Sequence, residues 1–378
     1  MAASAFSFGA GQDNYTGEVL DDLLTGLAQE NETYKEGLIH IKPGIQKKYT
    51  LPSVKLGKII QDHKATPDSS QGEYVFAERY LEPQDFMVYI EFNPRDYEQY
   101  YRPFQPKGNL VFRTLDPKVQ ATMIRLLLEN EQEYINQAIW CSATAAEKAK
   151  IASGDGKVTA GNTEIGGDAE AGPMKYFNGA IVRMLANAAA AATSEDAKCG
   201  QVKIAGTGAF ADGEAVEKEL YAMWGATEPK VRKQAGLVIL MDYKSWDAYN
   251  KYLASKTMKY SDNRAENQHI FQGKRIIPMV ALPNDTIIMG RFTTGTNSNL
   301  WMGVDYVNDE NVLQIDKVQN NSELYFMKVL LKMDVNIVRP AEITAHLPFA
   351  YGAASGGSGT PGGGGTSGTG TGGGAGNP

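Results

Sequence analysis

The chain has 378 residues, of which 42% are apolar, 10% aromatic and 21% charged. A net charge of −7 excludes nucleic-acid affinity driven by bulk positive charge. The two cysteines, Cys141 and Cys199, exclude a disulfide scaffold, and no apolar run approaches the ~18 residues of a membrane-spanning helix. Because single cores usually divide beyond ~250–300 residues, a chain of this length predicts two lobes or one elaborated domain.

The first part of the chain predicts an arm followed by an extended hairpin. Residues 1–16 are small and polar, and apolar residues at three- and four-residue spacing predict a short amphipathic helix over 19–27. Residues 37–81 contain two extended runs joined by the turn-rich KATPDSSQG, which predicts a long β-hairpin. Charged residues are interspersed along both runs. We therefore expect a hairpin that is polar on both faces and reaches outward from its own domain.

The next elements give the clearest periodicities. DFMVYIEF (85–92) alternates between apolar and mixed positions, which predicts a half-buried strand. Asp116 and Pro117 are the favoured N-cap and N1 pair, and no breaker follows before residue 141. A helix over 116–141 would be a rod of about 38 Å. In the same way, alternation over FMKVLLKMDVNIV (326–338) predicts a strand long enough to lie along that helix.

Between these long elements the pattern changes twice. Residues 142–175 are rich in small and polar residues and predict an inserted surface loop. Helix and strand signals then alternate: a helix is expected over 174–192 and a strand over 236–241, and the chain is mostly strand from about 274. The last 27 residues hold 14 of the 40 glycines and no charge, so we expect a flexible tail within 347–378.

One segment resembles a nucleotide-binding loop. QVKIAGTGAFADG places Gly206, Gly208 and Ala211 at G-x-G-x-x-A spacing between a predicted strand and a predicted helix. The strand-end acid that would hold a ribose is too distant, since Asp242 lies 31 residues past Ala211. The alternative is a plain strand-to-helix turn in which Asp212 begins the helix. Both interpretations stay open from the sequence.

Other chemistry-bearing residues predict contacts rather than catalysis. Cys141 follows Trp140 in an apolar helix and is expected to be a buried thiol. No motif indicates a metal or a cofactor, and no catalytic residues are assigned. Charged residues of the hairpin and a tyrosine pair that follows the 85–92 strand are the candidates for contact with other subunits. They are Lys64, Asp68, Glu73, Glu78, Arg79, Tyr100 and Tyr101.

Several segments, taken in this order and at this spacing, resemble a known family. They are PGIQKKYTLPSV, YLEPQDFMVYIEFNPRDYE, LVFRTLDPKVQ, KYFNGAIVRML, NLWMGVDY and VLQIDKVQNNSELYFMKVLLKMDVNIV, which together span about residues 30–345. In these segments the chain resembles the major capsid proteins of tailed phages with the Hong Kong 97-like fold, particularly those of crAss-like and related Bacteroidetes phages.

The resemblance implies an α+β fold divided among the parts of such a subunit. These would be an N-terminal arm (1–36), an E-loop hairpin (37–81), a peripheral domain (82–150 with 318–346) on a spine helix (116–141), the inserted loop (142–175), an axial domain (176–317) and the tail.

The resemblance also implies a function and partners. Hexamers and pentamers of the chain would assemble in the bacterial host cytoplasm into an icosahedral shell around double-stranded DNA, bound without sequence specificity. The arm is too short for a fused scaffolding segment, so a separate scaffolding protein, a portal and other head proteins are implied partners, and no membrane is involved. A nanocompartment shell protein of the same fold is a variant of this hypothesis, and a nucleotide-binding enzyme that uses the Gly206 loop is the alternative.

Overall fold

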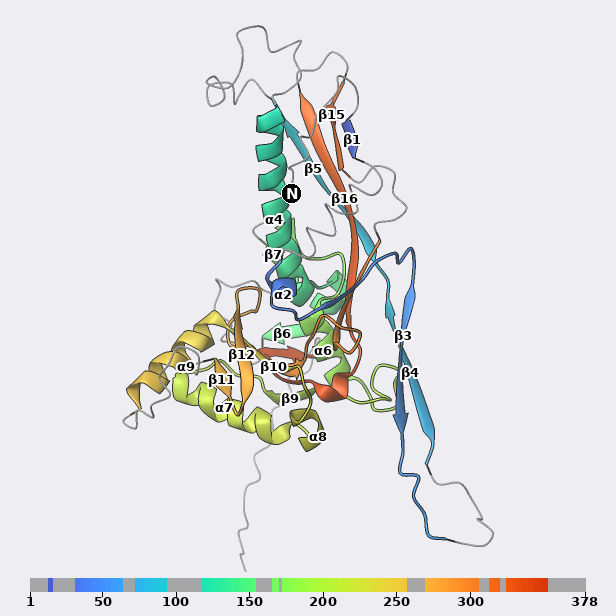
Figure 1. Cartoon of the computed structure of the whole chain (residues 1–378), viewed down its shortest axis with the longest axis vertical. Helices are drawn as coiled ribbons and strands as arrows, with labels where there is room; N and C mark the ends of the chain where they lie inside the picture. Colours follow the sequence, from blue (N-terminus) through green and yellow to red (C-terminus); the bar gives the residue numbers. More distant parts are fainter. Residues whose placement is uncertain are drawn as a thin grey trace, which may run out of the picture.

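The computed structural model describes residues 13–15, 31–63, 72–93, 117–153, 165–169, 172–256, 269–305, 313–319 and 324–352. Within these ranges the chain is α+β, as predicted, and has three visible parts (Figure 1). An elongated part combines one long helix with a long sheet. A compact α/β lobe lies below it, and a two-stranded hairpin projects from the opposite side of the molecule.

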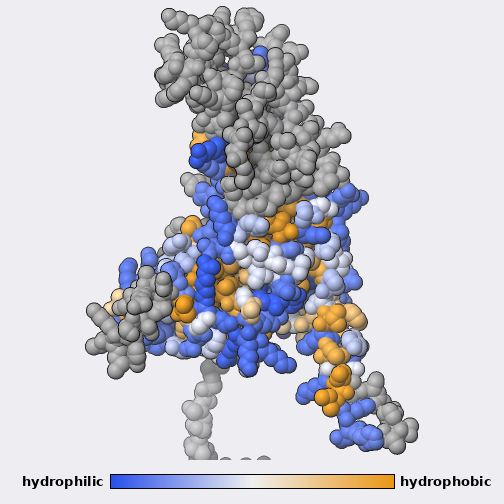
Figure 2. Space-filling view, viewed as in Figure 1, coloured by the Kyte–Doolittle hydropathy of each residue, from blue (hydrophilic) through white to orange (hydrophobic). Residues whose placement is uncertain are grey.

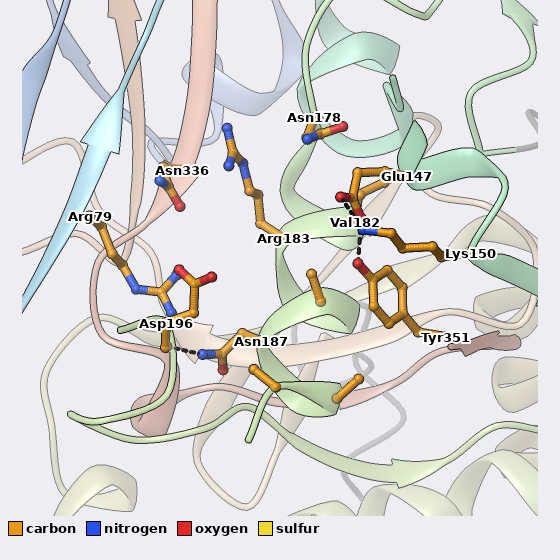
Figure 3. Close-up of a pocket in the computed structure, with 13 residues that line it drawn as sticks. Arg79, Glu147, Lys150, Asn178, Val182, Arg183, Asn187, Asp196, Asn336 and Tyr351 are labelled. Carbon is orange, nitrogen blue, oxygen red and sulfur yellow. Dashed lines mark hydrogen bonds and ion pairs between the residues drawn. The ribbon is translucent and has the colours of Figure 1, made fainter. Parts of the chain in front are cut away.

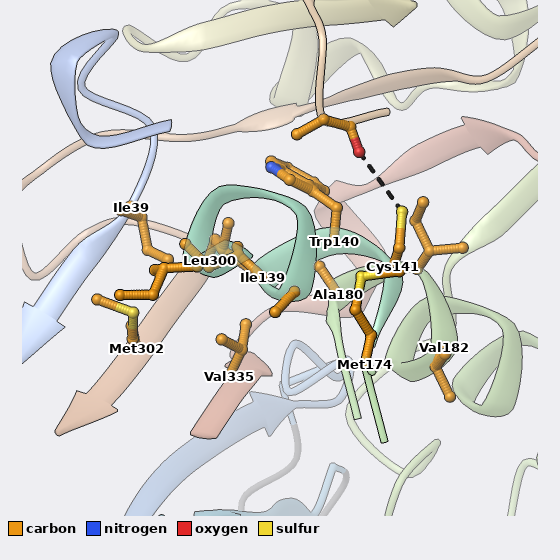
Figure 4. Close-up of a cluster of buried hydrophobic side chains, with 14 of the residues drawn as sticks. Ile39, Ile139, Trp140, Cys141, Met174, Ala180, Val182, Leu300, Met302 and Val335 are labelled. Carbon is orange, nitrogen blue, oxygen red and sulfur yellow. Dashed lines mark hydrogen bonds between the residues drawn. The ribbon is translucent and has the colours of Figure 1, made fainter. Parts of the chain in front are cut away.

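The long helix α4 runs over Pro117–Cys141, where the sequence predicts a helix over 116–141. From Leu127 onward it faces the core through residues at three- and four-residue spacing, among them Leu127, Tyr134 and Ala138. At its C-terminal end Trp140 is fully buried and donates a hydrogen bond from Nε1 to Thr33 Oγ1 at 3.0 Å. The end of the helix is therefore fixed in the centre of the largest apolar cluster (Figure 4).

The sheet beside α4 is organised around one 13-residue strand, β16. One edge of β16 pairs antiparallel with β5 over nine residues, and the other edge pairs first with β15 and then with β14. Phe86 of β5 meets the helix, with its ring centroid 5.7 Å from that of Tyr134. The strands are β1 (Asp13–Tyr15), β2 (His40–Lys42), β5 (Gln84–Phe92), β14 (Leu300–Val304), β15 (Leu313–Lys317) and β16 (Tyr325–Ile337).

The α/β lobe contains a second six-stranded sheet, in the order β11-β12-β10-β13-β17-β9. Alternate residues of its central strand β10 face opposite sides: Ile239 packs with α7 and α9, and Leu240 packs in the main core. The lobe is therefore continuous with the elongated part. Its elements are β9 (Lys203–Gly206), α7 (Gly213–Ala226), α8 (Pro229–Arg232), β10 (Leu237–Asp242), α9 (Tyr243–Ser255), β11 (Ile270–Phe271), β12 (Lys274–Met279), β13 (Ile287–Arg291) and β17 (Thr344–His346).

The remaining elements are the hairpin and short connecting segments. The hairpin consists of β3 and β4, paired antiparallel over eight residues. The bounds are α2 (Glu32–Lys35), β3 (Tyr49–Leu56), β4 (Tyr74–Leu81), α5 (Ala145–Lys148), β6 (Ile151–Ser153), β7 (Asp168–Ala169), β8 (Gly172–Pro173), α6 (Ala180–Ala189), the 3-10 turn η3 (Pro340–Glu342) and β18 (Phe349–Tyr351).

Several predicted boundaries differ from the structure. The helix expected over 174–192 is confined to α6, because Gly179 passes so close to α4 that a Cβ there would lie 2.8 Å from the Trp140 carbonyl. Within the predicted surface loop 142–175, Ile165 and Met174 are buried. The segment is therefore partly built into the core, because its few apolar residues lie against the end of α4.

Both ends of the fold are more ordered than the sequence indicates. Thr33 of α2 is buried and donates from Oγ1 to Asn136 Oδ1 at 2.7 Å, so the end of the predicted arm is docked on α4. At the other end β18 pairs with β6, and Leu347 and Phe349 are buried, so the tail begins after Tyr351 and not at 347. The helix expected over 19–27 lies outside the described residues.

Candidate assembly surface

The register of the hairpin gives its two faces different characters. Val54 lies directly opposite Phe76, and Leu56 directly opposite Tyr74, so these four side chains share one face. Because side chains alternate along a strand, Leu51, Ala77, Arg79 and Leu81 belong to the other face. The two faces are treated separately below, since only one of them is covered by the chain itself.

The covered face anchors the base of the hairpin. Leu51, Ala77 and Leu81 are buried, and Leu81 packs in a small cluster with Ile45 and Val338. Arg79 is only 5% exposed and donates from Nη1 to the Ile337 carbonyl oxygen at 3.3 Å and from Nη2 to the Asp196 carbonyl oxygen. Burial lowers the pKa of the Arg79 guanidinium. The base of the hairpin is therefore held rigidly against the end of β16.

The other face carries an exposed apolar patch. Phe76 is 63% exposed, and the ring centroids of Tyr74 and Phe76 lie 6.4 Å apart in a stacked arrangement. Figure 2 shows this patch as a hydrophobic region on the projecting arm. The expectation of a hairpin that is polar on both faces was wrong. We define the hairpin patch as the exposed side chains Val54, Leu56, Ile59, Ile60, Tyr74 and Phe76.

None of the described residues covers the hairpin patch. Beyond the paired strands, Gly57 N donates to the Glu73 carbonyl oxygen at 3.2 Å, and Ile60 is 90% exposed. A two-stranded ribbon alone is marginally stable in water, and contiguous exposed apolar patches mark interaction sites. Burying each such side chain against a partner would contribute roughly 1.5–3 kcal/mol. The patch is therefore the part of the described surface best suited to subunit contact.

The seven predicted contact residues have different outcomes. Glu73 and Glu78 are exposed on the hairpin, and Glu78 accepts a hydrogen bond from Tyr80 Oη at 2.7 Å. Arg79 is excluded as a contact, because its side chain is buried within its own chain. The other four candidates, Lys64, Asp68, Tyr100 and Tyr101, lie outside the described residues. The apolar patch was missed because its members come from two strands whose register the sequence does not reveal.

The Gly206 loop is not arranged as a nucleotide site. A dinucleotide fold needs a strand, a helix and a second strand parallel to and near the first. Among the described strands β9 lies at the edge of its sheet and pairs with β17, and β13 and β17 separate it from β10. A Cβ at Gly206 would lie 2.6 Å from Nδ1 of His346, so the glycine is needed for contact within the lobe.

The helix that follows this loop is also occupied by its own chain. Asp212 caps α7 by accepting a hydrogen bond from Ala215 N at 2.8 Å. A Cβ at Gly213 would lie 2.1 Å from the Ala248 carbonyl oxygen, so α9 packs directly on the first turn of α7. The geometry therefore favours a strand-to-helix turn over a phosphate-binding loop.

The remaining candidates for chemistry are structural. Cys141 is fully buried and donates from Sγ to the Ala281 carbonyl oxygen at 3.4 Å, and burial raises the pKa of the thiol (Figure 4).

Among the described residues no group of three or more His, Cys, Asp or Glu side chains could hold a metal ion. In that same part of the chain, none of the helices is both long and apolar enough to cross a membrane.

Comparisons with known proteins give structural matches alone. No protein-family model matches the sequence, and no curated protein matches it. The capsid of Myoviridae Phage XM1 aligns with a TM-score of 0.49 and 9% identity, over 92% of this chain and 96% of that chain. The Satellite phage P4 procapsid including size determination (Sid) protein aligns with a TM-score of 0.47 and 11% identity, over 87% of this chain and 98% of that chain.

A third similar structure is the capsid of the native GTA particle. It aligns with a TM-score of 0.45 and 13% identity, over 91% of this chain and 95% of that chain. These three similar structures are two capsids and one procapsid. At this low similarity the function has to be inferred from the chain's own surfaces.

Proposed function

We propose that this chain is a structural major capsid protein, whose copies assemble into a closed shell around packaged double-stranded DNA. The observation that carries the proposal is the hairpin patch, which projects from a rigid base and is left exposed by the described part of the chain. A projecting arm of this kind supplies the contact that an assembling subunit needs. The hairpin therefore has the role of an E-loop.

In this proposal the other parts of the fold take the remaining roles of a shell subunit. The long helix α4 with β5 and β16 forms a peripheral domain, and the α/β lobe forms an axial domain around the centre of a hexamer or pentamer. The Gly206 loop gives a nucleotide-dependent enzyme no site, which favours the structural role over the enzymatic alternative. A nanocompartment shell would use the same surfaces. Its cargo would distinguish it from a phage head.

The charge of the chain bears on its partners. A net charge of −7 repels phosphate, so contact of the inner wall with DNA is weak and independent of sequence. A separate scaffolding protein would direct assembly, and a portal and further head proteins would complete the virion. Assembly takes place in the cytoplasm of a bacterial host.

Assembly of the purified protein tests the proposal. Size-exclusion chromatography and negative-stain microscopy should show pentamers, hexamers or closed particles for the unaltered chain, in the presence of a scaffolding protein if one is required. Phe76→Glu should abolish particles and leave the subunit folded by circular dichroism, because it places a charge in the hairpin patch. Lys55→Glu, on the opposite face of the same arm, is the matched control and should assemble.

A chain that stays a small oligomer under every assembly condition would overturn the proposal. Normal particles from Phe76→Glu would show that the arm is a passive loop, and the shell function would then need a different contact surface.

A further inference from the structure

Two polar sites in the described part of the chain differ in how their hydrogen-bonding groups are matched. In the pocket at the base of the hairpin, Arg183 pairs with Asp334 at 3.2 Å. In the same pocket Lys150 pairs with Glu147 at 2.9 Å, as Figure 3 shows. The chain itself therefore balances those charges. The second site surrounds His346 of β17, and there the matching depends on a single proton.

The imidazole ring of His346 is enclosed by the glycine-rich loop that follows β9. Its side chain is 5% exposed, and the ring of Phe210 stacks on it with the two centroids 4.4 Å apart. Nε2 lies 2.7 Å from the Gly208 carbonyl oxygen. A Cβ at Gly206 would lie 2.6 Å from Nδ1, so the backbone at the end of β9 packs directly against the ring. The G-x-G spacing of this segment thus lets the loop wrap around a histidine.

Each ring nitrogen of His346 faces an oxygen atom. Because the Gly208 carbonyl can only accept, Nε2 carries the hydrogen of that bond. Nδ1 lies 3.0 Å from Oε1 of Glu219 on α7, and neither of these two atoms has a hydrogen-bond partner elsewhere among the described residues. Without a proton between them, a ring lone pair and a carboxylate oxygen would face each other in the interior. One proton, on the ring or on the carboxyl group, makes the contact attractive.

The charged groups of the surrounding elements have partners of their own. On β9, Lys203 donates from Nζ to the carbonyl oxygen at the end of α7 at 3.0 Å. Asp285, just before β13, pairs with Lys244 at 2.8 Å, and Asp212 in the loop caps α7. The other acidic residues near the start of α7 pair with lysines: Glu214 with Lys218, and Glu217 with Lys256. Glu219 is therefore the charged group of the described residues that faces the ring.

We propose that His346 and Glu219 form a proton-dependent switch that holds the Gly206 loop, residues 206–212, against the lobe. With one proton in the pair, the ring connects α7 through Glu219 to the loop through Gly208. Loss of that proton as the pH rises leaves two buried acceptors in contact, so the side chains must separate and the loop opens. The loop is thus closed at acidic pH and open at alkaline pH. The inference is independent of the proposed shell function, because all of these residues belong to one subunit.

Hydrogen–deuterium exchange followed by mass spectrometry tests the switch in the full-length chain. Exchange of the peptide that covers residues 206–213 is compared at pH 5.5 and pH 8.5, on either side of the range in which imidazole ordinarily titrates. After correction for the intrinsic chemical rate at each pH, we expect the loop to exchange at least tenfold faster at pH 8.5. The peptide over β10, in the middle of the same sheet, reports opening of the whole lobe and should keep its corrected rate.

A conservative variant removes the need for the proton. In Glu219→Gln the side-chain amide can donate to Nδ1 of the neutral ring, so both ring nitrogens are matched at either pH. Corrected exchange of the loop should then differ by less than twofold between the two pH values. Glu214→Gln is the matched control, because it removes an exposed ion pair with Lys218 on the same helix and should keep the tenfold difference. Melting followed by circular dichroism verifies that both variants are folded.

Three results would overturn the inference. The first is equal corrected exchange of the loop at both pH values in the unaltered chain, a measurement that needs no variant. The second is a tenfold difference that persists in Glu219→Gln, because the loop would then respond to a different group. The third is an equal acceleration of the β10 peptide at pH 8.5, which would mean that the whole lobe opens and not the loop.

Discussion

Arg79 donates a hydrogen bond to the carbonyl oxygen of Ile337, a residue 258 positions later in the chain, at 3.3 Å. The same guanidinium donates to the Asp196 carbonyl oxygen, so one side chain connects the hairpin, the end of β16 and the loop after α6. Nearby, Asn336 Nδ2 donates to the Tyr80 carbonyl oxygen at 2.7 Å, which adds a second bond between β16 and the hairpin. The hairpin is thus fixed at its base by polar contacts inside the core.

Removing the Arg79 anchor should destabilise the subunit. Arg79→Met leaves the Ile337 and Asp196 carbonyl oxygens without this donor, and we expect a loss of about 2–4 kcal/mol in the free energy of unfolding. Urea denaturation followed by circular dichroism measures it. Glu78→Gln, one residue away on the exposed face, should change the value by less than about 0.5 kcal/mol. If Arg79→Met lost no more free energy of unfolding than the Glu78→Gln control, the Arg79 hydrogen bonds would not stabilise the fold.

The tip of the hairpin should be needed for assembly and not for folding. Replacing residues 64–72 with Asn-Gly leaves the β3–β4 ladder intact, so the melting temperature should stay within about 2 °C. Closed particles should be lost in negative-stain images, because contacts worth only ~0–1 kcal/mol each are repeated in every subunit of a shell. Normal particles from this variant would show that assembly does not need contacts made by the tip.

Stability should fall as the pH rises, because Glu131 is buried on α4. It is 2% exposed, neither of its oxygens has a hydrogen-bond partner among the described residues, and burial raises its pKa from 4.5 to about 8. Below pH 4.5 the carboxyl is protonated in both the folded and the unfolded chain. Between pH 4.5 and about 8 only the unfolded chain ionises, so the folded state loses free energy over that window, and the loss is complete above it.

Glu131→Gln removes this titration and tests the assignment. The variant should be more stable than the unaltered chain at pH 8, by up to roughly 4–5 kcal/mol, with a much smaller difference at pH 5. Urea denaturation at both values measures the change. Glu129→Gln, an exposed carboxylate on the same helix, should show no such dependence, and a pH-independent gain in Glu131→Gln would contradict the assignment.

Truncations should locate the end of the folded chain. Stopping after Gly352 removes a segment with no charge and, apart from two prolines, no apolar side chain larger than alanine, so melting of the isolated subunit should shift by less than about 2 °C. Stopping after Pro348 also removes β18 and the buried Phe349, and should lower the melting temperature by about 5 °C or more. Similar melting temperatures for both truncations would mean that β18 does not contribute to the thermal stability of the fold.

A methyl group on Gly213 should damage the lobe without affecting any ligand. In Gly213→Ala the new Cβ would lie 2.1 Å from the Ala248 carbonyl oxygen, so α7 and α9 must separate, at a cost of about 1–3 kcal/mol. Thermal denaturation measures this loss, and Gly225→Ala, where a Cβ would meet nothing within 4 Å, is the control. ATP or NAD should not shift the melting temperature of the unaltered chain, and a saturable shift would restore the nucleotide alternative.

The sequence predicted the elements whose periodicity is local. Helix α4 and strands β5 and β16 each carry a complete pattern within one segment, so their ends are correct to within one residue. Features that depend on two segments were not predictable. The hairpin patch needs the register of Val54 with Phe76, and the burial of Arg79 needs the end of β16, neither of which a linear pattern contains.

Helix α6 illustrates the same limit at an element boundary. Residues 174–178 have helical composition, but Ser142 Oγ donates to the Phe177 carbonyl oxygen at 2.7 Å and Gly179 lies against Trp140. Tertiary contacts therefore override local propensity there. The buried Glu131 was equally hidden, because it has the same residue type and spacing as its exposed neighbours Glu129 and Glu133.

The pairing of β5 with β16 determines how the subunit carries a mechanical load. The hairpin leads through Glu82 and Pro83 directly into β5, so a neighbour that pulls on the arm pulls β5 along its own axis. The nine paired positions of the antiparallel ladder are then loaded in shear, and their hydrogen bonds resist together and do not open one after another. Tension from a container under internal pressure would thus be spread along the whole strand.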